Sequence, residues 1–311
     1  MLVLVGPTAV GKTAAAVALA QELGGEVLTA DSMQIYRGMD IGTAKPTIAE
    51  KQGVPHHLID LVNPDEEFTV ADYVARADAL IAEVAARGAV PIIAGGTGLY
   101  INALLDRWEF PPHPTDMTFR RTLTEEAERS GPEVIHARLA EIDPASAARL
   151  HPNDVHRTVR ALEVHHLTGR PLSNFTWKPA TDGPYAPQIF GLTIARDILH
   201  ERLATRIHQQ LDAGLEAEVR RLVDAGYGPE LTSMKGITYR QFGGYLRDVY
   251  DYDTAVELSI RDSRRYARRQ YTWFNADPRV QWVDCLRTIR LATLAHGLRT
   301  LIRRIKGLGR F

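Results

Sequence analysis

The sequence predicts an α/β fold in which a parallel sheet flanked by helices is interrupted by an inserted all-helical domain. A glycine-rich motif at residues 6–13 lies between an apolar run at 1–5 and a strong helix former at 14–20. Apolar strands then alternate with helical patterns, which is typical of a parallel sheet. Residues 111–187 carry helical patterns without a convincing strand. Together these features predict a P-loop NTPase-like core with an insertion.

The glycine-rich motif fits the phosphate-binding pattern G-x-x-x-x-G-K-[ST]. Its residues are Gly6, Pro7, Thr8, Ala9, Val10, Gly11, Lys12 and Thr13. The glycines let successive backbone N–H groups face phosphate oxygens, and the following helix adds its positive end. Lys12 would reach the outer phosphate and the Thr13 hydroxyl would hold Mg²⁺. The motif predicts a phosphorylated ligand, but it is shared by ATP-binding kinases, NTPases and transferases that act on diphosphate esters.

The next predicted elements are a strand at 26–30, a helix at 70–86 and a strand at 90–94. Thr69 is the expected N-cap of the helix and Gly88 its stop. Asp31 follows the first of these strands, and Thr97 follows the second within a glycine-rich turn. Because ligands bind beyond the carboxyl ends of parallel strands, we expect Asp31 and Thr97 to lie near Lys12.

The middle of the chain, residues 113–187, is predicted to be a helical insertion domain, and 1–112 with 188–311 form the core. The remaining core elements are a strand at 188–194, helices within 197–225 and 254–274, a last strand at 279–283 and an amphipathic C-terminal helix.

Composition indicates a globular protein of the cytoplasm that does not enter the membrane. The chain has 311 residues with 45% hydrophobic content, enough for a large core. It contains no run of about 18 apolar residues that could span a membrane. Its lone cysteine, Cys285, excludes an internal disulfide and indicates a reducing compartment.

Charge is distributed unevenly. Residues 1–110 hold 7 of the 37 basic and 14 of the 38 acidic residues, which leaves 30 basic and 24 acidic residues in the rest. The first part therefore has a balance of −7 and the rest a balance of +6. This asymmetry suggests that the later part faces a polyanion, although a solvated basic surface would give the same balance.

Polar side chains gather just after the strand at 26–30. Asp31 could accept a proton from an incoming nucleophile or bind Mg²⁺ through water. Gln34 has the donors and acceptor needed to read a base edge. In isolation these two residues would more often be a helix cap and a surface residue. The density of polar groups at the end of a strand favours a functional role for them.

The chain resembles the bacterial tRNA dimethylallyltransferases, also called tRNA isopentenyltransferases, over nearly its whole length. The phosphate loop is shared with many families, whereas the sixteen residues from Asp31 to Pro46 are highly specific. The resemblance rests on residues 6–13, 31–46, 95–100, 151–154, 157 and 160–163, 202 and 206, 214–219, and 266–274.

The resemblance implies transfer of a dimethylallyl group from dimethylallyl diphosphate to the exocyclic amine of the adenosine just 3′ of the tRNA anticodon. It implies a Mg²⁺-dependent monomer with catalytic residues Thr8, Lys12, Asp31 and Arg206. Arg206 and Lys12 would stabilise the leaving diphosphate, and Asp31 would take the proton of the amine.

By the same resemblance, the insertion domain and parts of the core contact tRNA, and the target base flips out of its stack. The implied contact residues are Asp31, Ser32, Met33, Gln34, Thr97, Arg120, His156, Arg157, Thr158, Val159, Arg160, Lys235, Gly236, Ile237, Thr238, Tyr239 and Arg240. The chain departs from the family pattern at Thr238, where glycine is expected, and at Asn275, where arginine is expected.

Two rival functions use the same residues. An ATP-dependent small-molecule kinase would employ the phosphate loop and Asp31 on a substrate hydroxyl. An RNA-binding P-loop module would bind without turnover. A basic stripe of Arg261, Arg264, Arg265 and Arg268 at helical spacing favours a nucleic acid partner once the charge asymmetry is considered, although such stripes are more often solvated helix faces.

Overall fold

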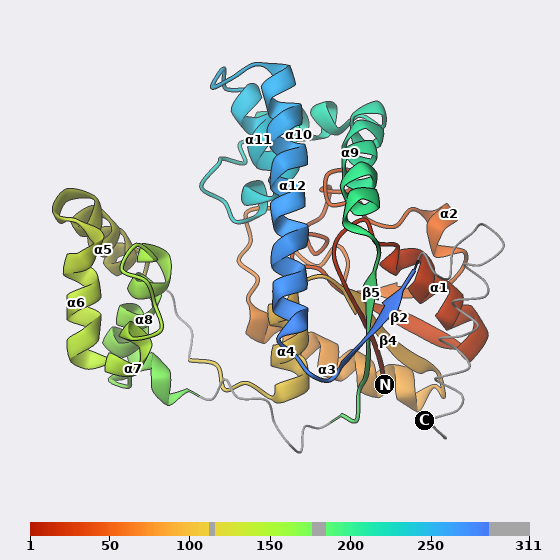
Figure 1. Cartoon of the computed structure of the whole chain (residues 1–311), viewed down its shortest axis with the longest axis horizontal. Helices are drawn as coiled ribbons and strands as arrows, with labels where there is room; N and C mark the ends of the chain where they lie inside the picture. The colour runs from red at the N-terminus through yellow and green to blue at the C-terminus, as the bar shows by residue number, and fades with distance from the viewer. Residues whose placement is uncertain (112–115, 176–184, 286–311) are drawn as a thin grey trace. The chain divides into compact units, whose positions relative to one another are not determined.

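A computed structural model describes residues 1–111, 116–175 and 185–285 (Figure 1). Its contacts divide the chain into a core unit, Met1–Leu105 with Pro184–Phe311, and a helical unit, Asp106–Gly183. The sequence placed these divisions at 112/113 and 187/188. The C-terminal helix expected from the sequence lies in 286–311, outside the described residues.

The core unit is built on a six-stranded parallel sheet of order β3-β2-β4-β1-β5-β6. The strands are β1 (Leu2–Val5), β2 (Gly25–Ala30), β3 (His56–His57), β4 (Val90–Gly95), β5 (Gln188–Thr193) and β6 (Val280–Asp284). The predicted α/β fold is confirmed, and each strand expected from the sequence is present to within one residue at either end. The two-residue β3 was missed because it is too short to show a periodic pattern.

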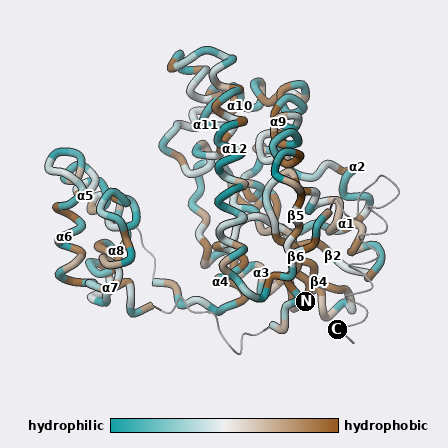
Figure 2. Tube along the Cα trace, in the orientation of Figure 1, coloured by the Kyte–Doolittle hydropathy of each residue, from teal (hydrophilic) through white to brown (hydrophobic). Residues whose placement is uncertain are grey.

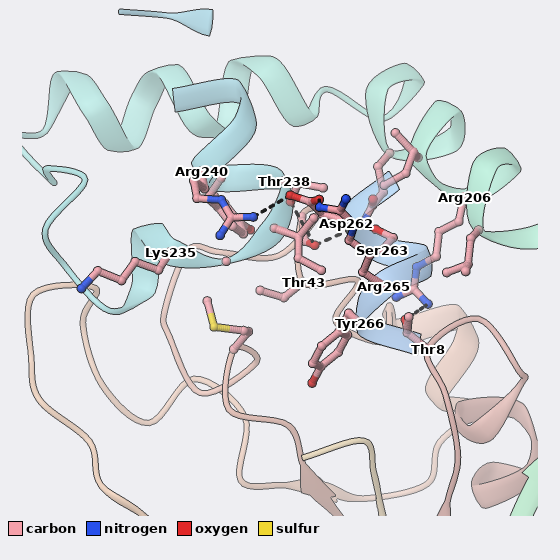
Figure 3. A pocket seen from close by; sticks show the side chains of 18 of the residues that line it. Thr8, Thr43, Arg206, Lys235, Thr238, Arg240, Asp262, Ser263, Arg265 and Tyr266 are labelled. Carbon is pink, nitrogen blue, oxygen red and sulfur yellow. Dashed lines mark hydrogen bonds and ion pairs between the residues drawn. The ribbon is translucent and has the colours of Figure 1, made fainter. Parts of the chain in front are cut away.

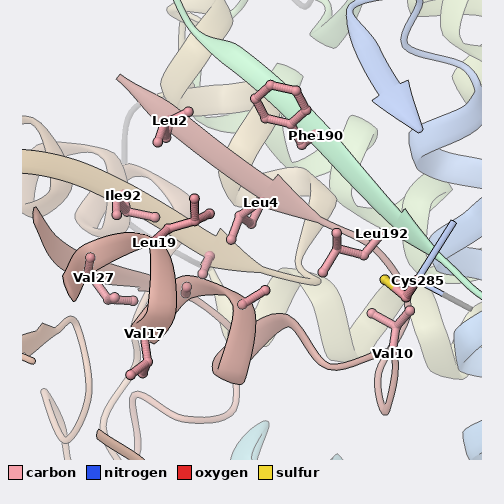
Figure 4. Packing of buried hydrophobic residues seen from close by; sticks show 14 of the residues in the cluster. Leu2, Leu4, Val10, Val17, Leu19, Val27, Ile92, Phe190, Leu192 and Cys285 are labelled. Atoms are coloured by element: carbon pink, nitrogen blue, oxygen red, sulfur yellow. The ribbon is translucent and has the colours of Figure 1, made fainter. Parts of the chain in front are cut away.

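Helices cover both faces of this sheet. On one face lies α1 (Lys12–Leu23), and on the other lie α3 (Val70–Ala86) and α4 (Gly98–Asp106). The short α2 (Ile48–Lys51) has no buried residue. Along β1, Leu4 packs in a cluster with Leu19 of α1 (Figure 4), whereas Val5 packs in a second cluster with Tyr73 of α3. Successive strand side chains point to opposite faces, so a fully apolar strand is buried on both sides.

Helix α3 begins and ends where the sequence predicts. Thr69 accepts a hydrogen bond from the Asp72 backbone N–H, and the Asp72 carboxylate accepts one from the Thr69 N–H, forming a capping box. Gly88 follows the helix with φ of 76°, the left-handed conformation in which glycine is least strained.

The later part of the core unit forms a helical layer. Its helices are α9 (Arg196–Asp212), α10 (Leu215–Asp224), α11 (Ile237–Tyr245) and α12 (Tyr252–Asn275), with a 3-10 turn at Ser233–Lys235. Gly214, with φ of 99°, separates α9 from α10. This layer shares a hydrophobic cluster with Ile35, Tyr36 and Met39, which follow β2. Helix α12 is largely hydrophilic (Figure 2), which suits a helix that lines a polar site.

The helical unit has its own hydrophobic core, which includes Leu123, Ile135, Leu139 and Leu162. Its described elements are α5 (Met117–Ser130), α6 (Pro132–Ile142), α7 (Pro144–Ala147), α8 (Val155–Thr168) and a 3-10 turn at Leu172–Asn174. Across both units, none of the described helices is long and apolar enough to traverse a bilayer.

Candidate active site

The phosphate loop turns sharply between β1 and α1. Gly6 and Gly11 have φ of 141° and 108°, conformations that favour glycine. A Cβ on Gly6 would lie 2.6 Å from the carbonyl oxygen of Leu192 on β5. The loop therefore needs glycine both for its backbone angles and for its close approach to the sheet.

Lys12 lies inside this loop. Its ammonium donates hydrogen bonds to the carbonyl oxygens of Gly6 at 3.0 Å and Pro7 at 2.8 Å. Burial lowers the pKa of Lys12 to about 8; the negative charge of Asp31 partly opposes this shift, and the positive charge of Arg206 adds to it. The three charged groups are therefore close enough to influence one another.

Arg206 reaches the phosphate loop from α9. Its Nη1 donates to the Thr8 hydroxyl at 3.3 Å. Burial lowers the pKa of Arg206, and Asp31 and Glu50 partly oppose that shift. Thr8, Lys12, Asp31 and Arg206, the four catalytic residues expected from the sequence, all line one cavity of about 290 Å³.

Thr13 also lines this smaller cavity with an exposed side chain. Over residues 1–111, 116–175 and 185–285, no group of three or more His, Cys, Asp or Glu side chains could hold a metal. The oxygen donors of this cavity include Thr13 and Asp31, and they suit Mg²⁺, which usually binds through one or two protein oxygens, waters and ligand phosphates.

Gln270 of α12 was not assigned a role from the sequence. Its Oε1 accepts from the Thr8 backbone N–H at 2.8 Å, and its Nε2 donates to the Gly96 carbonyl at 3.0 Å. A Cβ on Gly96 would lie 2.1 Å from that Nε2. This buried amide thus joins the phosphate loop to the turn after β4. The available signals were a glutamine within a basic helix and the paired glycines at 95 and 96.

The ends of β2 and β4 meet beside the phosphate loop, as predicted. The Thr97 hydroxyl accepts from the Ser32 backbone N–H at 3.0 Å, and the Asp31 carboxylate accepts from the Met33 N–H at 2.9 Å. Burial and the charge of Asp31 raise the pKa of Tyr266, while hydrogen bonds to Thr97 and Gln270 oppose the shift. Tyr266 is therefore a neutral phenol next to Asp31.

A larger cavity of about 770 Å³ is also lined by some of these residues (Figure 3). Thr8, Asp31, Arg206 and Tyr266 line both cavities. The larger cavity is also lined by α12 residues Arg261, Asp262, Ser263, Arg265, Arg268 and Arg269, and by the stretch before and within α11. Of the predicted basic stripe, Arg264 is not among its lining residues.

Most tRNA-contact residues expected in the core unit line the larger cavity. These are Asp31, Ser32, Met33, Lys235, Gly236, Ile237, Thr238, Tyr239 and Arg240. Gln34 does not; it lines the smaller cavity, and its amide nitrogen donates to the carbonyls of Thr43 and Ala44, both at 3.1 Å. Because its donors are engaged in holding a loop, the structure gives no support to base reading by Gln34.

The contact residues expected in the helical unit differ in exposure. His156 and Arg157 are exposed, whereas Thr158 and Val159 are buried in the core of the unit. Arg120 and Arg160 both bind the buried carboxylate of Glu163, Arg120 through two hydrogen bonds of 2.9 and 2.8 Å. Burial raises the pKa of Glu163, but these two arginines outweigh it and hold the pKa below its usual value. The structure therefore supports surface contacts for His156 and Arg157 more than for Thr158 and Val159.

Comparison with known proteins identifies the family of this chain. Residues 34–277 match the family model for IPP transferase. The chain belongs to the IPP transferase family. This confirms the resemblance found in the sequence.

Two relatives named tRNA dimethylallyltransferase illustrate the similarity. The protein from Symbiobacterium thermophilum is 50% identical over 284 residues, covering 91% of this chain and 89% of the relative. The protein from Pelotomaculum thermopropionicum is 47% identical over 283 residues, covering 91% and 90%.

Solved structures agree with this assignment. The tRNA isopentenylpyrophosphate transferase of Bacillus halodurans is 42% identical with a TM-score of 0.68, covering 91% of this chain and 89% of that one. Its counterpart from Staphylococcus epidermidis is 35% identical with a TM-score of 0.71, covering 99% of both chains. A eukaryotic dimethylallyltransferase shares the fold at 24% identity, with a TM-score of 0.81.

Proposed function

We propose that the protein transfers the dimethylallyl group of dimethylallyl diphosphate to the exocyclic amine of the adenosine just 3′ of a tRNA anticodon. Family membership supports the reaction class. The observation that carries the proposal is the meeting of two chemically different cavities at Thr8, Asp31, Arg206 and Tyr266. A phosphate-binding side and a basic side share one junction, which suits group transfer from a diphosphate to a nucleic acid.

The smaller cavity would hold the diphosphate. Lys12 and Arg206 line it and, together with backbone N–H groups of the loop, would stabilise the charge that develops on the leaving group. Each charge-assisted hydrogen bond contributes about 1.5 to 3 kcal/mol. A Mg²⁺ held by the Thr13 hydroxyl would neutralise further negative charge when bound.

The larger cavity would admit the flipped adenine beside Asp31. The amine nitrogen forms a bond to the allylic carbon while the bond from that carbon to the diphosphate oxygen breaks. Asp31 accepts the proton that the nitrogen loses, so the products are the alkylated base and diphosphate. The amine is a weak nucleophile because its lone pair is delocalised into the purine. Positioning of the amine against the allylic carbon therefore supplies much of the rate acceleration.

The basic residues on the larger cavity would bind tRNA phosphates, together with exposed residues of the helical unit. In the core unit we assign this role to Lys235, Arg240, Arg265 and Arg268, which line the cavity, and in the helical unit to the exposed Arg157. We propose that the protein acts as a monomer, since one core unit supplies the residues of both cavities.

Incubation with labelled dimethylallyl diphosphate and unmodified tRNA tests the function. We expect label in RNA, and we expect Asp31→Ala to lose transfer by orders of magnitude while retaining pyrophosphate binding, because Asp31 acts on the nucleophile side. ATP consumption without labelled RNA would instead indicate a kinase. Retained tRNA binding with no transfer would indicate a binding module.

A further inference from the structure

A single buried carboxylate organises the arginines of the larger cavity. Asp262 of α12 is 8% exposed. Its Oδ2 accepts from Arg240 Nη2 at 2.7 Å, and its Oδ1 accepts from Arg261 Nε at 2.9 Å and lies 3.6 Å from Arg265 Nη1. The Gln241 amide donates to Oδ2 at 2.8 Å. All three arginines line the cavity, and Figure 3 shows Arg240, Asp262 and Arg265 on adjoining helices.

The carboxylate is ionised. Burial raises the pKa of Asp262, but the hydrogen bond and charge of Arg261 together with those of Arg240 outweigh it and hold the pKa below its usual value. The arginine side chains stay about half exposed or more, at 51% for Arg240, 49% for Arg261 and 68% for Arg265. Arg240 and Arg261 each use one edge of the guanidinium on Asp262, Arg265 lies within ion-pair distance of it, and all three keep further donors for a ligand.

We propose that Asp262 is a positioning residue for tRNA binding, which fixes the three guanidiniums toward RNA phosphates before the RNA arrives. The inference rests on the proposed function. Arginine loses considerable rotamer freedom when it is immobilised, and a contact that fixes it in the free protein removes part of that loss from the binding step. A carboxylate also repels phosphate, so its presence among RNA-facing cations requires a compensating gain of this kind.

Two explanations of Asp262 lead to opposite results for Asp262→Asn. If the carboxylate acts only through its charge, the variant adds one positive charge to the surface, so tRNA binds more tightly and with a steeper salt dependence. If Asp262 positions the arginines, the variant binds tRNA more weakly, by about tenfold, despite its extra positive charge.

The matched control is Glu257→Gln, which makes the same charge change at an exposed position of the same helix. Affinity for unmodified tRNA is measured against salt for wild type and both variants, with pyrophosphate affinity and thermal midpoint measured in parallel. We expect Asp262→Asn to weaken tRNA binding and raise the KM for tRNA, with pyrophosphate affinity and kcat near wild type, and Glu257→Gln to resemble wild type. Equal or tighter tRNA binding by Asp262→Asn would overturn the proposal.

A second variant covers the case in which Asp262→Asn does not fold. Asp262→Glu keeps the charge but moves the carboxylate outward by one methylene. If Asp262 positions the arginines, this variant binds tRNA more weakly than wild type. If Asp262 acts only through its charge, the tRNA affinity stays the same. Wild-type affinity in Asp262→Glu would also overturn the proposal. Failure of the wild-type protein to transfer the prenyl group would contradict the proposed function instead, so the two failures are distinguishable.

Discussion

At the scale of single residues, Lys12 connects the phosphate loop to the chemistry most directly. Its ammonium is buried beside Arg206, and its pKa is lowered to about 8. In the free protein it therefore changes charge at a mildly alkaline pH. A bound diphosphate favours the charged ammonium, so binding of this anion is coupled to proton uptake by Lys12.

The first prediction concerns pH. The lowered pKa means that Lys12 is charged below about pH 8 and loses its charge as pH rises through that value. Pyrophosphate affinity should then fall above pH 8, by at most about tenfold per pH unit. Calorimetric titrations with pyrophosphate between pH 7 and 9.5 measure this change in affinity. Lys12→Arg keeps its charge throughout, so its affinity should fall less steeply, and the ionisation of pyrophosphate itself is common to both proteins. Parallel pH profiles would contradict this role.

The same pKa shift affects the stability of the folded protein in the opposite direction, because stability should rise with pH where pyrophosphate affinity falls. Because the folded-state pKa of Lys12 lies below its ordinary value of 10.5, burial of the charged form costs stability at pH below 8, and this cost is relieved as pH rises from 8 to 10.5. The expected pH dependence of anion binding and this stability cost thus have the same origin in the desolvated ammonium.

At the scale of elements, the turn between β4 and α4 controls how the phosphate loop is held. Gly96 allows the Gln270 amide to approach, and that amide joins the turn to the Thr8 N–H. The turn also supplies Thr97 to the Ser32 N–H. The phosphate loop, the turn after β4, the segment after β2 and helix α12 are therefore coupled through three buried or partly buried hydrogen bonds.

The second prediction is that Gly96→Ala slows prenyl transfer by about tenfold or more. The added methyl would displace Gln270, and the loss of a buried hydrogen bond costs about 1 to 3 kcal/mol. Gly228→Ala serves as a control, because the atoms nearest its new methyl belong to the flexible end of the Glu230 side chain. Single-turnover rates at saturating substrates measure the effect. A Gly96→Ala rate equal to that of the control would show that the bridge is dispensable.

At the scale of the whole molecule, the core unit contains both cavities and the chain needs no second copy to complete them. The exposed large hydrophobic residues in the described ranges are spread over several elements; they are Ile48, Leu99, Met117, Val134, Val249, Tyr252 and Trp273. Such scattered residues are normal on a monomer, whereas a stable dimer usually buries a contiguous apolar patch.

The third prediction follows from this surface. Sedimentation or light scattering at micromolar concentration should give a mass near 34.6 kDa, with or without pyrophosphate. A mass of about twice that value would contradict the monomer. Addition of tRNA should give a complex with one protein per RNA, because one core unit presents one junction of the two cavities.

Local features of the fold could be predicted because each depends on residues close in sequence. The phosphate loop follows from Gly6 and Gly11, the ends of α3 follow from Thr69 and Gly88, and the strands follow from their apolar runs. The division of β1 between two hydrophobic clusters also follows from the alternation of strand side chains. The meeting of Asp31 and Thr97 at one edge of the sheet could be predicted from the rule for parallel strands alone.

The sequence by itself determined the fold class, the family and the position of the glycine-rich loop, because these depend on short contiguous motifs. Only the tertiary structure decided that Gln270 bridges the phosphate loop, that the Gln34 amide is engaged by a neighbouring loop and that Asp262 gathers three arginines. The physical reason is the range of the contacts. Thr8 and Gln270 are 262 residues apart, and local sequence preferences cannot predict a hydrogen bond that forms only after helix α12 has packed against the sheet.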